Sequence, residues 1–152
     1  MLIRDIMTKE VFTVSPNASL EEVSKILIQN MIHGIPVVEG NVPIGMITES
    51  NFFTNGSMVV YLPEYISFLK KDTMFGKLSP EEKEKVDILL KTAAKDIMST
   101  PCITINEGDD VKDFFSLVRD KKMKSVPVVD DNGSLAGIVT LADVINLINI
   151  NA

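Results

Sequence analysis

The chain has 152 residues, of which 45% are hydrophobic and 24% charged, a balance that is ordinary for a globular protein and excludes a wholly disordered chain. The 15 Lys and Arg residues against 21 Asp and Glu residues give a net charge of −6, which argues against proteins that coat nucleic acid or bind membranes through a polybasic surface. A single cysteine and a single histidine exclude an internal disulfide and argue against most metal sites. We therefore expect a cytoplasmic protein with no metal, no nucleic-acid partner and no membrane partner.

Four sequence blocks occur twice, in the same order and almost the same spacing. They are residues 5–8 and 96–99, 13–14 and 104–105, 35–38 and 126–129, and 45–48 and 137–140. The spacing is 91 residues for the first three pairs and 92 for the last, because one residue is added in the turn-forming stretch 130–133. The constant register predicts a tandem repeat, with one copy at 1–54, an insert at 55–92 and a second copy at 93–152.

Each copy is predicted to run helix, strand, strand, helix, with a short strand near Thr13 or Thr104. The first helix follows the capping box Ser19-Leu20-Glu21-Glu22 in one copy and Asp110 in the other. The apolar residues at helical spacing are Leu20, Val23, Ile26 and Leu27, and then Val111, Phe114, Phe115 and Val118. Strands are expected at 35–38, 44–47, 126–129 and 135–139, with a closing helix clearest at 140–150. A proline inside the first strand of each pair favours an edge strand or a strand start.

The insert at 55–92 is predicted to hold two helices. Ser79-Pro80-Glu81-Glu82 is a strong helix start, and Val86, Leu89, Leu90 and Ala93 give that helix an apolar face. A structural hairpin packed on the repeats is preferred over a docking surface, because aliphatic stripes usually belong to a core.

Thr140-Leu141-Ala142-Asp143 opens a helix directly after a strand. The free N–H groups and partial positive charge of such a helix start suit a phosphate, and an Asp one turn in can accept hydrogen bonds from two neighbouring ribose hydroxyls. The same Thr-x-x-Asp pattern is also a variant of the capping box, so a purely structural interpretation stays open.

The repeated motifs resemble those of the cystathionine-β-synthase (CBS) domain family. The resemblance is carried by Asp-Ile-Met-[Ser/Thr], by the middle blocks at 33–38 and 124–129, and by Gly-x-[Ile/Val]-Thr-x-x-[Asp/Asn]. It implies an α/β (α+β) fold of two β-α-β-β-α repeats packed around a pseudo-twofold axis, with the insert outside the family pattern. It also implies a regulatory module that binds adenosyl compounds in clefts between the copies, often as a dimer of pairs.

The resemblance implies two clefts. In the first, Thr140 and Asp143, with Asp143 on the ribose, would face Thr13, Ala18, Ile32, His33, Gly34 and Pro36. In the second, Thr48 and Asn51 would face Thr104, Asp109, Met123, Lys124 and Ser125. The sequence departs from the family pattern at Asn51, which replaces the ribose Asp, and at Asp109, which replaces a small residue. We therefore expect the first cleft to bind an adenosyl ligand more tightly, and Asn51→Asp to narrow the difference.

Lys121, Lys122 and Lys124 form the tightest basic cluster. Lys121 and Lys122 suit either phosphate neutralisation or a solvated helix end. Lys124 and its counterpart His33 directly precede the middle blocks, which favours a place beside the implied clefts.

Catalysis has little support in the sequence. It contains no Gly-x-Ser-x-Gly motif, no Walker A motif and no zinc-ligand spacing, and Cys102 has no histidine near it in sequence. We expect no enzyme and no cofactor, but a regulatory protein that binds AMP, ADP or ATP and acts on an effector protein in trans. The alternatives are a ligand-free dimerisation scaffold and an S-adenosylmethionine binder. An apolar stripe on the last helix predicts a homodimer. Its residues are Leu141, Val144, Ile145, Leu147 and Ile148.

Overall fold

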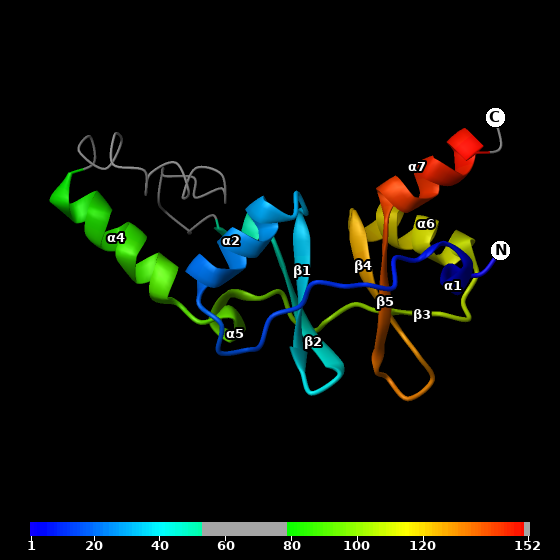
Figure 1. The fold of residues 1–152 in the computed structure, drawn as a ribbon, viewed down its shortest axis with the longest axis horizontal. Coiled ribbons are helices and arrows are strands. Elements are labelled where there is room, and N and C mark those ends of the chain that lie inside the picture. Colours follow the sequence, from blue (N-terminus) through cyan, green and yellow to red (C-terminus); the bar gives the residue numbers. More distant parts are fainter. Residues whose placement is uncertain (53–78, 151–152) are drawn as a thin grey trace. The chain divides into compact units, whose positions relative to one another are not determined.

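The computed structural model describes residues 1–52 and 79–150, which fall into two compact units that are each described by itself (Figure 1). Unit 1 consists of Met1–Val11, Gly40–Pro43 and Pro101–Ala152, and unit 2 of Phe12–Glu39 and Ile44–Thr100. Each unit therefore joins the body of one sequence copy to the opening segment of the other. The Asp-Ile-Met-Thr motif at 5–8 belongs to unit 1, and its repeat at 96–99 belongs to unit 2.

Unit 1 is built on a three-stranded sheet in the order β3-β4-β5. Its elements are α1 (Ile3–Ile6), β3 (Ile105–Asn106), α6 (Val111–Lys121), β4 (Ser125–Val129), β5 (Leu135–Thr140) and α7 (Leu141–Ile150). Strand β3 pairs with β4 in parallel and β5 pairs with β4 antiparallel, and helix α1 lies beside α7 and β5. The core contains the fully buried Phe114, together with apolar residues from all three strands.

Unit 2 has a two-stranded sheet, β1-β2. Its elements are α2 (Leu20–Gln29), β1 (Gly34–Glu39), β2 (Val42–Thr48, of which the first two residues group with unit 1), the 3₁₀ helix η1 (Glu49–Phe52), α4 (Pro80–Lys91) and α5 (Ala94–Ile97). Its core surrounds Phe52 and includes Leu89 and Leu90 of α4. The two sheets and their covering helices confirm the predicted α/β class, as do the predicted strands, which the structure extends by a residue or two at most at each end.

The predicted helix starts are confirmed by their caps. The Ser19 hydroxyl accepts a hydrogen bond from the Glu22 N–H at 3.2 Å, and Asp110 and Asp113 form a reciprocal capping box at the start of α6. Phe115 differs from the prediction: it is 46% exposed, because it lies about 100° around the helix from the buried Phe114.

The proposed insert is described only in part. Helix α4 begins at Pro80, as the Ser-Pro-Glu-Glu pattern predicts, and its last turn packs into the core of unit 2 through Leu89 and Leu90. The helix ends at Lys91, before Ala93. The first predicted helix of the insert lies outside the described residues.

The proline in β4 is a correction, because Pro127 lies inside the middle strand of its sheet. It faces Ile138 of β5, whose N–H and C=O both bond to the backbone of Thr8 on the other side. The partner β3 reaches only Val128 and Val129. No backbone donor is therefore required of Pro127 on the β5 side, and a central proline is tolerated.

Candidate functional site

The Asp143 side chain caps helix α7. Its Oδ2 accepts hydrogen bonds from the Thr140 N–H at 2.7 Å and from the Thr140 hydroxyl at 3.0 Å. In return, the Asp143 N–H donates to the Thr140 hydroxyl oxygen at 3.3 Å. The capping interaction is therefore present, and it fixes the carboxylate at the end of β5 while leaving Oδ1 outside the cap.

The other carboxylate oxygen is held by the opening segment of the chain. The Thr8 hydroxyl donates to Asp143 Oδ1 at 3.2 Å. The Thr8 backbone is fixed by two hydrogen bonds with Ile138 on the outer edge of β5, each 2.9 Å. Gly137 allows this approach, because a Cβ there would lie 2.8 Å from the Thr8 carbonyl oxygen and 2.8 Å from Met7 Sδ. The glycine of one motif thus accommodates the methionine and threonine of the other.

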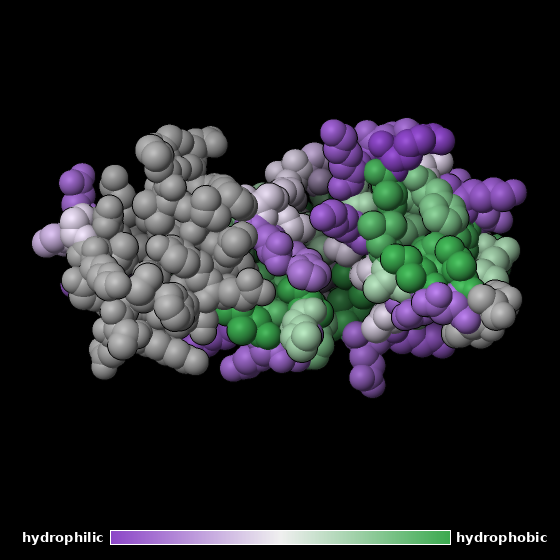
Figure 2. Space-filling model, turned by 90° about the horizontal axis from the view of Figure 1, so that it is seen from above, coloured by the Kyte–Doolittle hydropathy of each residue, from purple (hydrophilic) through white to green (hydrophobic). Residues whose placement is uncertain are grey.

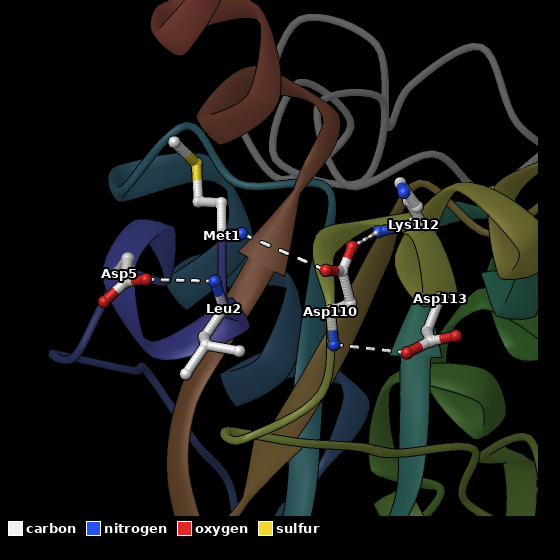
Figure 3. Close-up of polar contacts among 6 residues, drawn as sticks. All are labelled: Met1, Leu2, Asp5, Asp110, Lys112 and Asp113. Carbon is white, nitrogen blue, oxygen red and sulfur yellow. Dashed lines mark hydrogen bonds and ion pairs between the residues drawn. The ribbon is translucent and has the colours of Figure 1, made fainter.

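The opening segment is also fixed at its own start (Figure 3). The Leu2 N–H donates to Asp5 Oδ2 at 2.9 Å, and the Met1 ammonium lies 3.9 Å from Asp110 Oδ2. Asp110 also accepts from the Lys112 N–H at 2.9 Å, and this bond lowers the pKa of Asp110 below its ordinary value. Backbone hydrogen bonds from the Ile3 N–H to the Asp109 carbonyl and from the Arg4 N–H to the Glu107 carbonyl, each 2.9 Å, hold this segment against the start of α6.

Unit 2 repeats this arrangement with an amide in place of the carboxylate. Asn51 Oδ1 accepts from the Thr48 N–H at 2.8 Å and from the Thr48 hydroxyl at 3.3 Å. Asn51 Nδ2 donates to the Ile97 carbonyl at 2.8 Å and to Ser99 Oγ at 3.2 Å. The Ser99 backbone bonds to Met46, as Thr8 bonds to Ile138. Both lone pairs and both protons of the Asn51 amide are in use.

The residues before the middle strands also differ between the units. In unit 1, Ser125 pairs with Thr140, and the Lys124 carbonyl accepts from the Leu141 N–H at 3.0 Å, so the exposed Lys124 lies beside the start of α7. In unit 2, the 79% exposed His33 places Nδ1 2.7 Å from Glu49 Oε1. Lys121 ends α6 and Lys122 is its left-handed cap, both exposed.

The structure groups the predicted site residues by unit. Unit 1 brings together Thr140, Asp143, Lys124 and Ser125, and unit 2 brings together Thr48, Asn51 and His33. Of the others, Thr13, Ala18, Ile32, Gly34 and Pro36 belong to unit 2, and Thr104, Asp109 and Met123 to unit 1. Both predicted clefts draw on residues of both units, so their assembly stays a prediction. Asp109 Oδ2 accepts from the Asn106 N–H at 2.9 Å within its own turn.

Sequence reasoning did not single out residues 8, 49 and 99, whose side chains contact Asp143, His33 and Asn51 in the structure. Thr8 and Ser99 carry a hydroxyl at the same place in the repeated opening motif, and this repetition is the signal that could have pointed to them. No sequence signal joins His33 to Glu49, because their contact depends on how β1 and β2 are paired.

Reactive groups are few in the part of the chain that the structure describes. Burial raises the pKa of the Cys102 thiol, which disfavours the nucleophilic thiolate. Residues 1–52 and 79–150 contain no group of three His, Cys, Asp or Glu side chains that could hold a metal ion. Within the same residues no helix is long and apolar enough to cross a membrane.

The sequence model of the CBS domain matches residues 3–55 and again residues 94–150. The chain belongs to the CBS domain family. The uncharacterized protein MJ1426 of Methanocaldococcus jannaschii is 31% identical to it, with 95% of this chain and 89% of that protein covered. The uncharacterized protein MK0525 of Methanopyrus kandleri is 31% identical and longer: the match covers 95% of this chain and 61% of that protein.

Two solved CBS structures are similar over nearly the whole chain. The CBS domain of a CBS-domain-containing membrane protein from Sphaerobacter thermophilus has a TM-score of 0.75 at 32% identity, with 97% of this chain and 87% of that chain covered. The CBS domain pair of protein MJ0100 has a TM-score of 0.69 at 25% identity, with coverages of 100% and 98%. The MJ0100 structure holds 5′-methylthioadenosine and S-adenosyl-L-methionine. The resemblance to tandem CBS proteins inferred from the motifs is thus confirmed.

Proposed function

We propose that the chain is a regulatory module that binds an adenosyl compound through its ribose at Asp143 and acts on an effector protein in trans. The observation that carries this proposal is the free acceptor capacity of Asp143. Its Oδ2 receives two donors from Thr140, but Oδ1 receives one, from Thr8, among the described residues. A carboxylate oxygen has two lone pairs, so Oδ1 of this partly exposed side chain can accept one more hydrogen bond. The adenosyl ligands of the MJ0100 pair support the choice of ligand class.

Within this class we propose an adenine nucleotide such as AMP or ATP. The exposed Lys124 lies beside the start of α7, where its carbonyl accepts from the Leu141 N–H and the Thr140 hydroxyl accepts from the Asp143 N–H. A cation and the partial positive charge of a helix start therefore lie near one another in unit 1 and suit a phosphate. The sulfonium centre of S-adenosylmethionine is a cation and gains nothing from Lys124, and that ligand offers the lysine a carboxylate in place of a phosphate. S-adenosylmethionine is the alternative, favoured by the ligands of MJ0100.

Titration calorimetry and thermal shift with AMP, ATP, 5′-methylthioadenosine and S-adenosylmethionine test the proposal. We expect heat and a raised melting temperature with AMP or ATP, since a ligand at 100 times its Kd stabilises the folded state by about 2.7 kcal/mol. Binding of the two sulfur compounds alone would favour the alternative. No heat and no shift with any of the four would reject the function and favour a ligand-free dimerisation scaffold.

We also propose a homodimer formed through α7. Ile145 and Ile148 on this helix are 54% and 65% exposed, while Val144 is buried in the core of unit 1. The right-hand part of Figure 2, over α6 and α7, shows hydrophobic surface gathered between hydrophilic residues. Exposed apolar patches on a soluble domain favour association. Light scattering at tens of micromolar should report a dimer, and Ile145→Ser with Ile148→Ser a monomer. A monomeric wild type contradicts the proposal.

A further inference from the structure

Asp143 alone offers one hydrogen-bond acceptor fewer than the two neighbouring hydroxyls of the proposed ligand need. A ribose presents two neighbouring hydroxyls, and each needs an acceptor. The three protein donors on the carboxylate leave one of its four lone pairs, on Oδ1, among the described residues. Asp143 can therefore accept one ribose hydroxyl without losing a bond that it already makes.

The second acceptor lies next to the first. The Thr8 hydroxyl uses its single proton on Asp143 Oδ1, and both lone pairs of its oxygen remain without a donor within the described residues. Its oxygen is 3.2 Å from Asp143 Oδ1, and the Thr8 side chain is exposed. Two adjacent oxygens, each with accepting capacity, match the two adjacent O–H groups of a vicinal diol. Because Thr8 donates to a carboxylate, its oxygen is also a better acceptor than that of an isolated hydroxyl.

We propose that Thr8 is a specificity-determining residue of the site: its hydroxyl oxygen accepts one hydroxyl of a vicinal diol, while Asp143 Oδ1 accepts the other. This inference rests on the proposed function, and it adds to the site a residue from the opening motif of the other sequence copy. The Thr8 backbone is fixed independently of its side chain by the two hydrogen bonds to Ile138. Its position is therefore set before any ligand arrives.

Unit 2 offers the matched control. Ser99 occupies the place of Thr8, but its oxygen already accepts from Asn51 Nδ2, and the neighbouring Asn51 Oδ1 already accepts two bonds. The pair of free acceptors is therefore missing there. Removing the Ser99 hydroxyl should leave diol binding at the Asp143 site unchanged.

The test is calorimetric titration of wild type, Thr8→Val, Thr8→Ser and Ser99→Ala with AMP, 2′-deoxy-AMP and 3′-deoxy-AMP. Thr8→Val keeps the shape and the backbone bonds of residue 8 and should bind AMP roughly 3- to 10-fold more weakly, the effect of one lost hydrogen bond. Thr8→Ser and Ser99→Ala should match wild type. For the deoxy nucleotide that lacks the hydroxyl facing Thr8, wild type and Thr8→Val should bind equally.

The outcomes separate the two hypotheses. Failure of wild type to bind AMP at all rejects the proposed nucleotide function, and the role of Thr8 with it. If wild type binds AMP but Thr8→Val binds equally well, or weakens AMP and both deoxy nucleotides by the same factor, the proposed function stands and the role of Thr8 is rejected. A melting curve of each variant shows whether a loss of affinity reflects a loss of folded protein.

Discussion

The ends of strands β5 and β2 carry the same backbone arrangement with different chemistry. In both units a Thr hydroxyl and N–H bond to the side chain three residues later, and the opening motif of the other copy adds a hydroxyl residue to the strand edge. In unit 1 that side chain is the carboxylate of Asp143, and one of its lone pairs has no donor within residues 1–52 and 79–150. In unit 2 it is the amide of Asn51, whose donors and acceptors are all used inside the protein.

This difference shows how one side chain decides whether the position keeps an unused hydrogen-bond acceptor among the described residues. Asn51 adds a hydrogen bond to the Ile97 carbonyl that Asp143 cannot make to its counterpart, because a carboxylate has no proton to donate. Lys124 in unit 1 corresponds to His33 in unit 2, which is engaged by Glu49. We therefore expect adenosyl binding at Asp143 to be tighter by at least several-fold.

Replacing Asp143 of unit 1 by asparagine, the residue that unit 2 has at this position, should give the largest change in AMP affinity. Asp143→Asn keeps an acceptor for the Thr140 N–H, so the cap survives, but its NH₂ group replaces the oxygen that would accept a ribose hydroxyl. We expect AMP affinity to fall by about 10- to 100-fold, since a hydrogen bond to a charged group contributes roughly 1.5–3 kcal/mol. Asn51→Ala is the matched variant and should leave this affinity unchanged. Equal losses in calorimetry for the two variants would contradict the comparison.

Gly137 and Gly45, which contact the repeated motifs at 5–8 and 96–99, should differ in how much an alanine at their position destabilises the protein. A Cβ at Gly137 meets the Thr8 backbone oxygen at 2.8 Å, whereas at Gly45 the three nearest atoms all belong to the Met98 side chain, whose outer part has more freedom to shift than a backbone oxygen. We expect Gly137→Ala to destabilise the protein by about 1–3 kcal/mol, the usual cost of overpacking, and Gly45→Ala by less. Thermal unfolding measures both. A larger loss for Gly45→Ala would show that the backbone contact of Thr8 yields more easily than a methionine side chain.

Replacing Asn51 of unit 2 by aspartate, the residue that unit 1 has at this position, should lower the thermal stability of the protein. Asn51→Asp supplies the missing acceptor and so narrows the difference in affinity between the two positions. It also removes the donor to the Ile97 carbonyl and sets a carboxylate oxygen near it. The loss should be about 1–3 kcal/mol, as for a polar group left without its partner. A lowered melting temperature with a gain in binding stoichiometry is the expected result; an unchanged melting temperature would show that the Ile97 bond is dispensable.

The stabilisation that the helix caps provide should depend on pH in unit 1 but not in unit 2. Helix α6 is capped by Asp110, whose pKa is lowered mainly by the Lys112 N–H, whereas α2 is capped by the uncharged Ser19. A lowered folded-state pKa means that the stabilisation is present above the ordinary Asp value of about 3.9 and is lost as the pH falls through the folded-state value. Between pH 5 and pH 3, wild type should therefore lose slightly more thermal stability than Asp110→Asn. Ser19→Ala should cost about 1 kcal/mol at either pH. An equal loss of thermal stability in wild type and Asp110→Asn would show that the Asp110 cap does not contribute to the acid sensitivity.

Much of the fold was predictable because its signals are local. The caps Ser19 and Asp110 and the start at Pro80 depend on residues within one turn, and the repeat register located the strands. The place of Pro127 in a central strand was not predictable, because it depends on Thr8 satisfying Ile138 from the far side. Asp143 stood out by its motif, but the hydroxyl that completes its surroundings lies 135 residues away in sequence.

The exchange of opening segments has a consequence for the order in which the chain is made. Unit 1 combines residues 1–11 with residues from 101 onward, so residues 1–11 leave the ribosome well before the residues on which they pack. Unit 2 consists of Phe12–Glu39 and Ile44–Thr100, so all of its residues are synthesised before Pro101. Synthesis at about 5–20 residues per second therefore gives unit 2 a lead of several seconds. During that interval β5 is absent, so the Thr8 N–H and C=O have no backbone partner. Unpaired backbone groups of this kind can bond to a strand of another chain.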